Sequence, residues 1–252
     1  PEYGKVFIVL KPTDASYLTS LTKSQIIADL KKYVVASVEP RIVDPSILYV
    51  ELTSKIYYNS LVTDQTTSNI RDKVISSIQS YLETSDTEKF NGKFRYSKFV
   101  GVIDDADVSI NSNLTSLMMR KDFYPSLNST FYYEVCFQNA FDEDCDDPVL
   151  SSTGFRVTEY PNFDVYVEDR DKKIVLYRLD SVTGEKVVLD SDIGDIDYVK
   201  GELKMYALTI IKGSFFDNRI SLRVKPLSND IKAMREVYPV SYTHLTLPTM
   251  DS

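Results

Sequence analysis

The sequence is poor in the residues on which most catalytic sites depend. It contains no Trp, eight Gly and a single His, His244, close to its C-terminal end. Few glycines argue against a glycine-looped nucleotide enzyme, and no P-loop, G-x-G-x-x-G or G-x-S-x-G motif occurs. Residues 1–239 contain no His, so a Ser-His-Asp or Cys-His arrangement cannot form there unless missing terminal parts of the protein or another chain complete it. The composition therefore points away from hydrolytic and nucleotide-dependent catalysis.

Long hydrophobic runs and excess positive charge are also absent. No apolar stretch approaches the ~18 residues of a membrane-spanning helix, so we expect no membrane partner. The chain has 37 acidic and 29 basic residues and a net charge of −8, which opposes a broad nucleic-acid surface. We expect no nucleic acid, no cofactor and no small-molecule substrate. The two cysteines, Cys136 and Cys145, are expected to be reduced thiols, with a disulfide between them as the alternative.

The stretch that holds His244 reads unlike the rest of the chain. Residues 240–249, VSYTHLTLPT, resemble the translation of a transposon-end sequencing adapter, a read-through that recurs in metagenomic shotgun assemblies. Segments of this kind are excluded from fold reasoning, so we predict that residues 240–252 are not native. The chain also opens on Pro1 and runs at once into an apolar stretch, and we expect it to be a fragment of a longer protein.

What the sequence has in abundance is Tyr and Phe, 18 and 12 residues, which is typical of a strand-rich protein. In its first half, strand and helix patterns alternate. The apolar residues 6–10 predict a buried strand, and a capping-box pattern at Thr22–Gln25 precedes a helical stripe. The stripe comprises Ile26, Ile27, Leu30, Tyr33 and Val34. Further along we predict an alternating strand at 46–59, a helix capped by Thr66 and Thr67, a short helix at 96–104 and a strand at 112–123. The fold class is therefore α+β over residues 1–127, with helices on one face of a small mixed sheet.

From residue 129 the pattern changes to strands and turns. Residues 164–180 read as two alternating strands around a charged turn, and Gly184 and Gly201 mark the turns that follow. One short helical segment is predicted over residues 229–237. The second domain, residues 128–239, is therefore predicted to be an all-β antiparallel module with a short C-terminal helical segment.

Two acidic clusters are candidates for metal binding or acid-base chemistry. Residues 142–147, DEDCDD, offer carboxylates that calcium prefers, but the spacing and glycine of an EF-hand loop are absent. We interpret this segment as a solvated loop. Asp104, Asp105 and Asp107 have no complementary nucleophile nearby in the sequence, and we interpret them as an acidic turn. The prediction is no metal site, no catalytic residue and no enzyme.

Two aromatic stretches are candidates for protein contact. Phe215 and Phe216 lie at an expected turn, where aromatic side chains either fold back over the core or anchor an interface. Arg95 and Tyr96 lie in FRYSKF, a mixture that fits stacking on nucleic-acid bases or a helix start with extended basic side chains. We take these four as candidate interface residues.

Several extended stretches resemble one family. They are residues 4–12, 30–52, 93–123, 152–157, 194–203 and 223–231. In this order they resemble the baseplate wedge subunit of T-even-type contractile-tailed phages, and the first half is also similar to the wider baseplate J family. The resemblance implies a structural virion protein of the tail baseplate, assembled in the host bacterial cytoplasm and without catalytic residues. It also implies pairing with a second copy of itself and contacts with other wedge proteins, which together clamp neighbouring subunits into the ring around the tail hub.

Two other functions stay open from the residues alone. One is a tail-associated binding module that recognises a host surface glycan or protein; the other is a tail-associated hydrolase. A clamp should expose aromatic patches on both domains, whereas a receptor binder should concentrate its aromatics in loops at one tip. A glycoside hydrolase would show a cleft with carboxylates about 5 to 9.5 Å apart.

Overall fold

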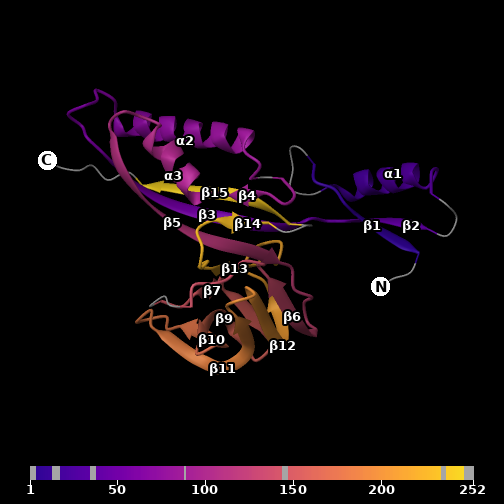
Figure 1. Ribbon diagram of the computed structural model, residues 1–252. Helices are drawn as coiled ribbons and strands as arrows, with labels where there is room; N and C mark the ends of the chain where they lie inside the picture. Colours follow the sequence, from indigo (N-terminus) through magenta and orange to yellow (C-terminus); the bar gives the residue numbers. More distant parts are fainter. Residues whose placement is uncertain are drawn as a thin grey trace.

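The computed structural model describes residues 4–12, 18–34, 38–87, 89–143 and 147–233, and the backbone of residues 237–246. The described chain is mostly β, with three helices. Figure 1 shows a small unit that projects to one side, a layer of two helices over a sheet, and a group of strands below that sheet. Among the described residues, no helix is long and apolar enough to cross a membrane.

The projecting unit consists of β1 (Lys5–Val9), α1 (Ser20–Leu30) and β2 (Glu39–Val43), and its two strands pair in parallel. The N-cap of α1 is Thr19, whose side chain accepts a hydrogen bond from the backbone N–H of Thr22, so the predicted capping box begins one turn too late. No residue of α1 is buried. The expectation that this helix packs on the same sheet as the other helices is wrong, because the short crossover returns the chain directly beside β1.

The helix-bearing part contains β3 (Ser46–Tyr58), α2 (Thr67–Thr84), α3 (Tyr96–Asp104) and β5 (Ile110–Phe123), and all four confirm the sequence patterns. Thr66 is the N-cap of α2, as predicted. β3 pairs with β5 in antiparallel orientation, and both helices lie on one face of this sheet (Figure 1). The side chains buried between helices and sheet are Leu48, Val50, Leu52, Ile56, Ile70, Val74, Ile78, Phe99 and Ile103.

The helix predicted over residues 229–237 is wrong where the chain is described. Residues 227–230 form bends, and β14 (Ile231–Lys232) pairs with β4 (Lys93–Phe94). Ile231 lies opposite Phe94, and both side chains are buried in the core. Burial of this apolar pair outweighs a helical preference that is worth only tenths of a kcal/mol per residue.

The remaining strands form the β-rich part. They are β6 (Thr130–Cys136), β7 (Leu150–Ser152), β8 (Phe155–Val157), β9 (Tyr160–Arg170), β10 (Lys173–Leu179), β11 (Lys186–Asp197), β12 (Glu202–Lys212) and β13 (Ile220–Val224). The sheet closes on itself here, because β9 pairs with both β8 and β10. Asp171 and Lys172 have positive φ in the tight turn that was predicted between β9 and β10.

One sheet and one core connect the two parts. β13 pairs with β5 on one side and with β7 on the other, so the sheet continues past residue 127. The domain boundary at residue 127 stays a prediction. The backbone of β15 (Val237–Thr246) runs parallel to β3, with Val237 opposite Ser46. The non-native origin of residues 240–252 likewise stays a prediction.

Candidate functional site

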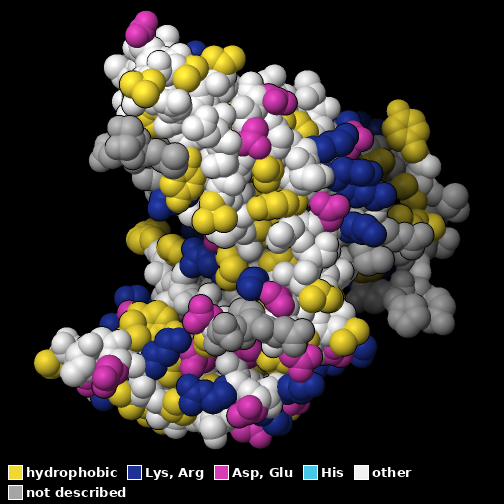
Figure 2. Space-filling view, turned by 60° about the vertical axis from the view of Figure 1, so that its left-hand side comes forward, with side chains coloured by type: hydrophobic (Ala, Val, Ile, Leu, Met, Phe, Trp, Pro, Cys, Tyr) yellow, Lys and Arg dark blue, Asp and Glu magenta, His cyan; other side chains and the backbone are white. Residues whose placement is uncertain are grey.

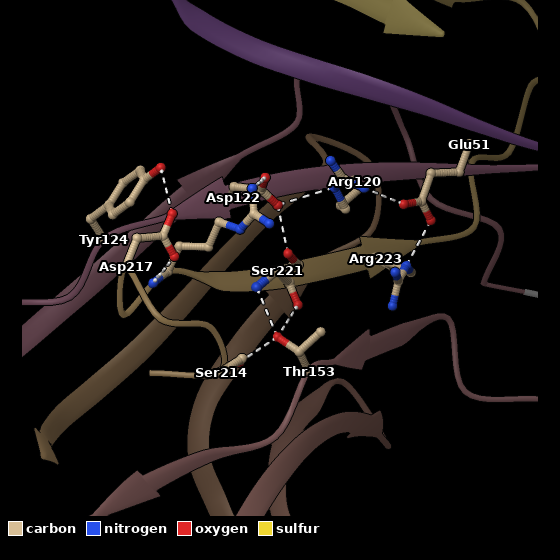
Figure 3. Close-up of polar contacts among 10 residues, drawn as sticks. Glu51, Arg120, Asp122, Tyr124, Thr153, Ser214, Asp217, Ser221 and Arg223 are labelled. Atoms are coloured by element: carbon tan, nitrogen blue, oxygen red, sulfur yellow. Dashed lines mark hydrogen bonds and ion pairs between the residues drawn. The ribbon is translucent and has the colours of Figure 1, made fainter. Parts of the chain in front are cut away.

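The most connected polar group lies where the helix-bearing part meets the β-rich part (Figure 3). It comprises Glu51 on β3, Arg120 and Asp122 on β5, and Ser221 and Arg223 on β13; we call it the polar junction. The register places Arg120 opposite Arg223 and Asp122 opposite Ser221. Because side chains alternate along a strand, these five share one face while their neighbours enter the core.

Glu51 holds the three strands together at this junction. Its Oε1 accepts a 2.6 Å hydrogen bond from Arg120, and its Oε2 accepts a 2.6 Å bond from Arg223 Nε. Burial favours the protonated form of Glu51, but the hydrogen bonds from Arg223 and Arg120 outweigh it and lower the pKa of Glu51. The carboxylate is therefore ionised at neutral pH and cross-links strands from both parts of the chain.

Asp122 extends the junction toward the end of β5. It accepts a 2.7 Å hydrogen bond from Ser221 Oγ and lies 3.1 Å from Arg120 Nε. The Arg120 guanidinium also stacks over Tyr49, 4.1 Å from the ring centroid. Charge-assisted contacts of this kind fix strand register as well as orientation. The arrangement is suited to a stiff structural joint.

The hydroxyl groups below the junction also serve the strands. Thr153 Oγ1 accepts a 3.0 Å hydrogen bond from the Ser221 backbone N–H and shares a 2.6 Å bond with Ser214 Oγ (Figure 3). These contacts attach the start of β13 to the segment between β7 and β8. The hydroxyl groups are used as structural cross-links.

The loop between β12 and β13 carries two of the predicted interface residues. Phe216 is fully exposed, and Phe215 is 39% exposed, with the Arg219 guanidinium 4.3 Å from its ring centroid. The interpretation that these aromatics fold back over the core is therefore wrong for Phe216. Asp217 braces the loop, since its Oδ1 accepts a bond from the Arg219 N–H at 3.2 Å. The interface role of both phenylalanines stays a prediction.

A hollow of about 400 Å³ lies at the same end of β5. Tyr124 lines it, and its hydroxyl lies 3.5 Å from Asp217 of the exposed loop. Hollows beside exposed aromatic side chains are common features of protein contact surfaces. The other lining residues are Asp44, Pro45, Ser46, Ile47, Tyr49 and Asp122.

Arg95 and Tyr96 lie elsewhere. The Tyr96 hydroxyl donates a 2.5 Å hydrogen bond to the backbone oxygen of Thr115 on β5, so this ring belongs to the fold, while Arg95 is exposed. Thr115 and Tyr124 are nine residues apart along an extended chain, or roughly 30 Å. The structure therefore does not bring the two pairs of predicted residues together. The two rings that flank Tyr96 in FRYSKF, Phe94 and Phe99, are fully buried and cannot stack on bases.

Two described carboxylates of the first acidic cluster form ion pairs. Asp142 pairs with Lys225 and Glu143 with Lys172, each at 2.8 Å. Among the described residues, no group of three or more His, Cys, Asp or Glu side chains is placed to hold a metal ion. Cys136 is a free thiol, and because Asp144, Cys145 and Asp146 lie outside the described residues, the predicted reduced state of Cys145 stays a prediction.

Asp107 belongs to the second acidic cluster and accepts three hydrogen bonds. Lys73 Nζ donates to it at 2.6 Å, and the hydroxyl and backbone N–H of Ser109 donate at 2.7 and 2.9 Å. These bonds, that from Lys73 first, lower the pKa of Asp107 to about 2. The carboxylate ties the N-terminal half of α2 to the turn before β5.

Comparison with known proteins fits this picture of a stiff, multiply cross-linked chain. Residues 46–122 match the family model "Baseplate structural protein gp6, C-terminal domain III", and residues 1–43 match "Baseplate structural protein gp6, C-terminal domain I". The first match spans β3 to β5, and the second spans the projecting unit. The chain therefore belongs to the class of structural subunits of phage tail baseplates.

The particular family follows from a curated relative. Over 133 residues, 52% of this chain, it is 32% identical to the baseplate wedge protein gp6 of Enterobacteria phage T4. The chain therefore matches part of a baseplate wedge subunit of the gp6 family, and it spans 20% of the length of that relative. The resemblance read from the sequence is confirmed.

The polar junction was missed by sequence reasoning. Glu51, Arg120 and Asp122 are visible as charged residues on the polar faces of two predicted strands. Arg223, which bonds Glu51, and Ser221, which bonds Asp122, belong to a strand about a hundred residues beyond β5. The local signal is the pair of arginines in RISLRV, residues 219–224, which include β13. Strand register, which decides the pairing, cannot be read from that signal.

Proposed function

We propose that the chain clamps neighbouring subunits into the ring around the tail hub. In this proposal it pairs with a second copy of itself and contacts other wedge proteins in the virion baseplate, after assembly in the host bacterial cytoplasm. It has no enzymatic role. The description of the matched family as structural supports this proposal, and the assignment of the chain to the baseplate rests on the same matches.

The distribution of exposed aromatic side chains carries the proposal. Phe7 on β1, Tyr33 after α1, Tyr132 on β6 and Phe216 in the β12–β13 loop are all exposed. Interface cores are enriched in aromatic residues, and two of these four lie on the projecting unit while the other two lie on the β-rich part. A module that recognises a host receptor would gather them in loops at one tip. The scatter favours a protein with several contact surfaces.

The stiffness of the junction supports the same role. A clamp transmits the position of one surface to another only if the surfaces are fixed relative to each other. Glu51 and its arginine partners link β3, β5 and β13, and the hydrophobic core continues across them. The exposed loop at residues 213–219 is therefore held on the same rigid sheet that carries α2 and α3.

Light scattering over a concentration series tests the proposal. We expect the average mass of the full chain to rise with concentration, and Phe216→Ser to reduce that rise. Val182→Ser is the matched control, because Val182 is also an exposed apolar residue at a turn. A parent chain that stays monomeric at every concentration would contradict pairing with a second copy.

A further inference from the structure

Three basic side chains converge where β4 leads into α3. Phe94 on β4 is fully buried, so Lys93 and Arg95 on either side of it point away from the core, and both are exposed. Lys98 is also exposed and lies in the first turn of α3, three residues after Arg95, a spacing that brings side chains together. All three line one hollow of about 570 Å³. Local strand and helix spacing therefore places three positive charges around one space.

The hollow also has acidic and neutral lining residues. Asp86 lines it, but its carboxylate lies 2.6 Å from Lys89 Nζ, so its charge is compensated by a fourth cation. Asp230, close to the start of α3, accepts a 2.9 Å hydrogen bond from the Tyr96 backbone N–H. The positive charges therefore outnumber the negative ones here. The lining residues, which define what we call the β4–α3 hollow, are Tyr81, Thr84, Ser85, Asp86, Asn91, Lys93, Arg95 and Lys98.

The basic side chains of the β4–α3 hollow are not used by the fold. Within the part of the chain that the structure describes, Lys93, Arg95 and Lys98 make no ion pair. Lys93 also lies directly opposite Lys232 in the pairing of β4 with β14, and both lysines are exposed. Like charges directly opposite each other on neighbouring strands are destabilising. Local conflicts of this kind are expected where side chains serve a function outside the fold.

The charge distribution over the surface agrees with this reading. The chain as a whole carries a net charge of −8. On the face that Figure 2 shows, Lys and Arg side chains gather on one flank of the helix-bearing part, whereas both signs are interspersed on the β-rich part. A local excess of one sign attracts small ligands of the opposite sign and raises their concentration nearby. The β4–α3 hollow is therefore suited to an anion.

The type and number of donors select among anions. A phosphate monoester carries close to two negative charges at neutral pH and three strong acceptor oxygens. The guanidinium of Arg95 can bind two of these oxygens, and Lys93 and Lys98 add point charges. The side-chain amide of Asn91 offers further N–H donors. A carboxylate or a phosphodiester has only one charge, which would leave more of the positive charge uncompensated.

We propose that the β4–α3 hollow binds a phosphate monoester group. Arg95 takes two of the phosphate oxygens, and Lys93 and Lys98 supply the remaining positive charge. This binding function goes beyond the clamp and does not rest on it, so its failure would leave the clamp unaffected. The same chemistry has two sources, a small soluble phosphate and the head group of a lipid such as phosphatidic acid.

A matched pair of probes tests the ligand class. Isothermal titration calorimetry of the full chain at low salt uses phenyl phosphate, and phenyl sulfate has the same ring and a tetrahedral group with only one charge. We expect phenyl phosphate to bind about tenfold more tightly or better, because each extra charge strengthens the hydrogen bonds to Arg and Lys. Equal affinities, or no binding of either probe, would overturn the phosphate site.

Neutral variants test the location. Arg95→Gln with Lys98→Gln removes two of the three charges and should weaken phenyl phosphate binding by about tenfold or more. Lys55→Gln with Lys212→Gln makes the same change in net charge at exposed residues outside the hollow and should bind like the parent. Parent-like binding by the first variant would exclude the hollow as the site. An equal loss in both variants would mean that only the overall charge matters, and it too would overturn the proposal.

A stability measurement separates a ligand role from a structural one. Because Lys93 faces Lys232, Lys93→Gln should raise the melting temperature while the affinity for phenyl phosphate falls. A lower melting temperature would contradict the assignment of Lys93 to a ligand.

Cosedimentation with vesicles distinguishes the two sources. Phosphatidylcholine vesicles are prepared with and without phosphatidic acid. Binding that requires phosphatidic acid and is lost in the Arg95→Gln, Lys98→Gln variant supports a lipid head group. Binding of phenyl phosphate without cosedimentation supports a soluble phosphate.

Discussion

Glu51 and Arg223 are 172 positions apart in the sequence, and their side chains meet in a hydrogen bond of 2.6 Å. Arg120 donates to the other carboxylate oxygen at the same distance. The first and last parts of the described core are therefore joined through one carboxylate on β3. A chain joined in this way can present distant surfaces in a fixed relation, which is what a baseplate subunit requires.

Replacement of Glu51 should destabilise the whole molecule. Glu51→Gln leaves the partly buried Arg223 without its counter-charge and Arg120 with Asp122 alone, and we expect a loss of about 2 to 4 kcal/mol in the free energy of unfolding. Urea denaturation followed by circular dichroism measures this. Glu185→Gln is the control, since Glu185 is exposed at a turn. Equal midpoints for Glu51→Gln and the control would show that the junction is dispensable.

The lowered pKa of Asp107 predicts that the stability of the chain depends on pH. Its pKa is lowered to about 2 in the folded chain by the hydrogen bond from Lys73 and those from Ser109. A lowered folded pKa gives stability that is present above the ordinary value of 3.8 and is lost as the pH falls toward 2.

We therefore expect Asp107→Asn to destabilise the chain at pH 6 and to have a smaller effect at pH 3. The Asp107–Lys73 pair is accessible to water on the lysine side, so the difference should be about 1 kcal/mol or less. Denaturation curves of both proteins at the two pH values give the comparison. A larger effect at pH 3 than at pH 6 would contradict the assigned sign.

The buried stripe of α2 should not tolerate charge. Val74 is fully buried and Ile78 nearly so, and Val74→Asp or Ile78→Asp would bury a carboxylate without a partner. We expect a loss of about 4 kcal/mol or more and unfolding of the helix-bearing part, visible in thermal melts. Ser76→Asp on the exposed face of the same helix is the control. Parent-like melts for both buried variants would show that the helix packs differently.

One surface substitution should stabilise the chain. Lys98 lies in the first turn of α3, and Lys98→Glu replaces a repulsive interaction with the helix dipole by an attractive one. We expect a gain of about 0.3 to 1 kcal/mol, which falls as salt is added. Thermal melts at low and high ionic strength measure both effects. A loss of stability at low salt would mean that Lys98 has a favourable contact inside the fold.

Elements with local causes were predictable. The cap at Thr66 and the spacing of Ile70, Val74 and Ile78 suffice to predict α2, because a helix is stabilised by residues three and four positions apart. The turns at Gly184 and Gly201 were found for a similar reason, since both have positive φ, which glycine adopts without strain. The family resemblance also rested on stretches of contiguous residues.

The features that the sequence left undecided depend on residues far apart in the chain. The helical pattern at residues 229–237 gave way because Ile231 pairs with Phe94, and α1 stands apart because β1 pairs with β2 rather than with β3. The exposure of Phe216 follows from where the β12–β13 loop lies on the sheet.

The sequence by itself therefore determined the helices, most strands, the turns and the family, all of which follow from local spacing and propensity. Only the tertiary structure decided the contact of Glu51 with Arg223 and the separate place of β1–α1–β2. The physical reason is strand register. A pairing between distant strands depends on the whole buried face, and a shift by one residue would turn every side chain to the other side.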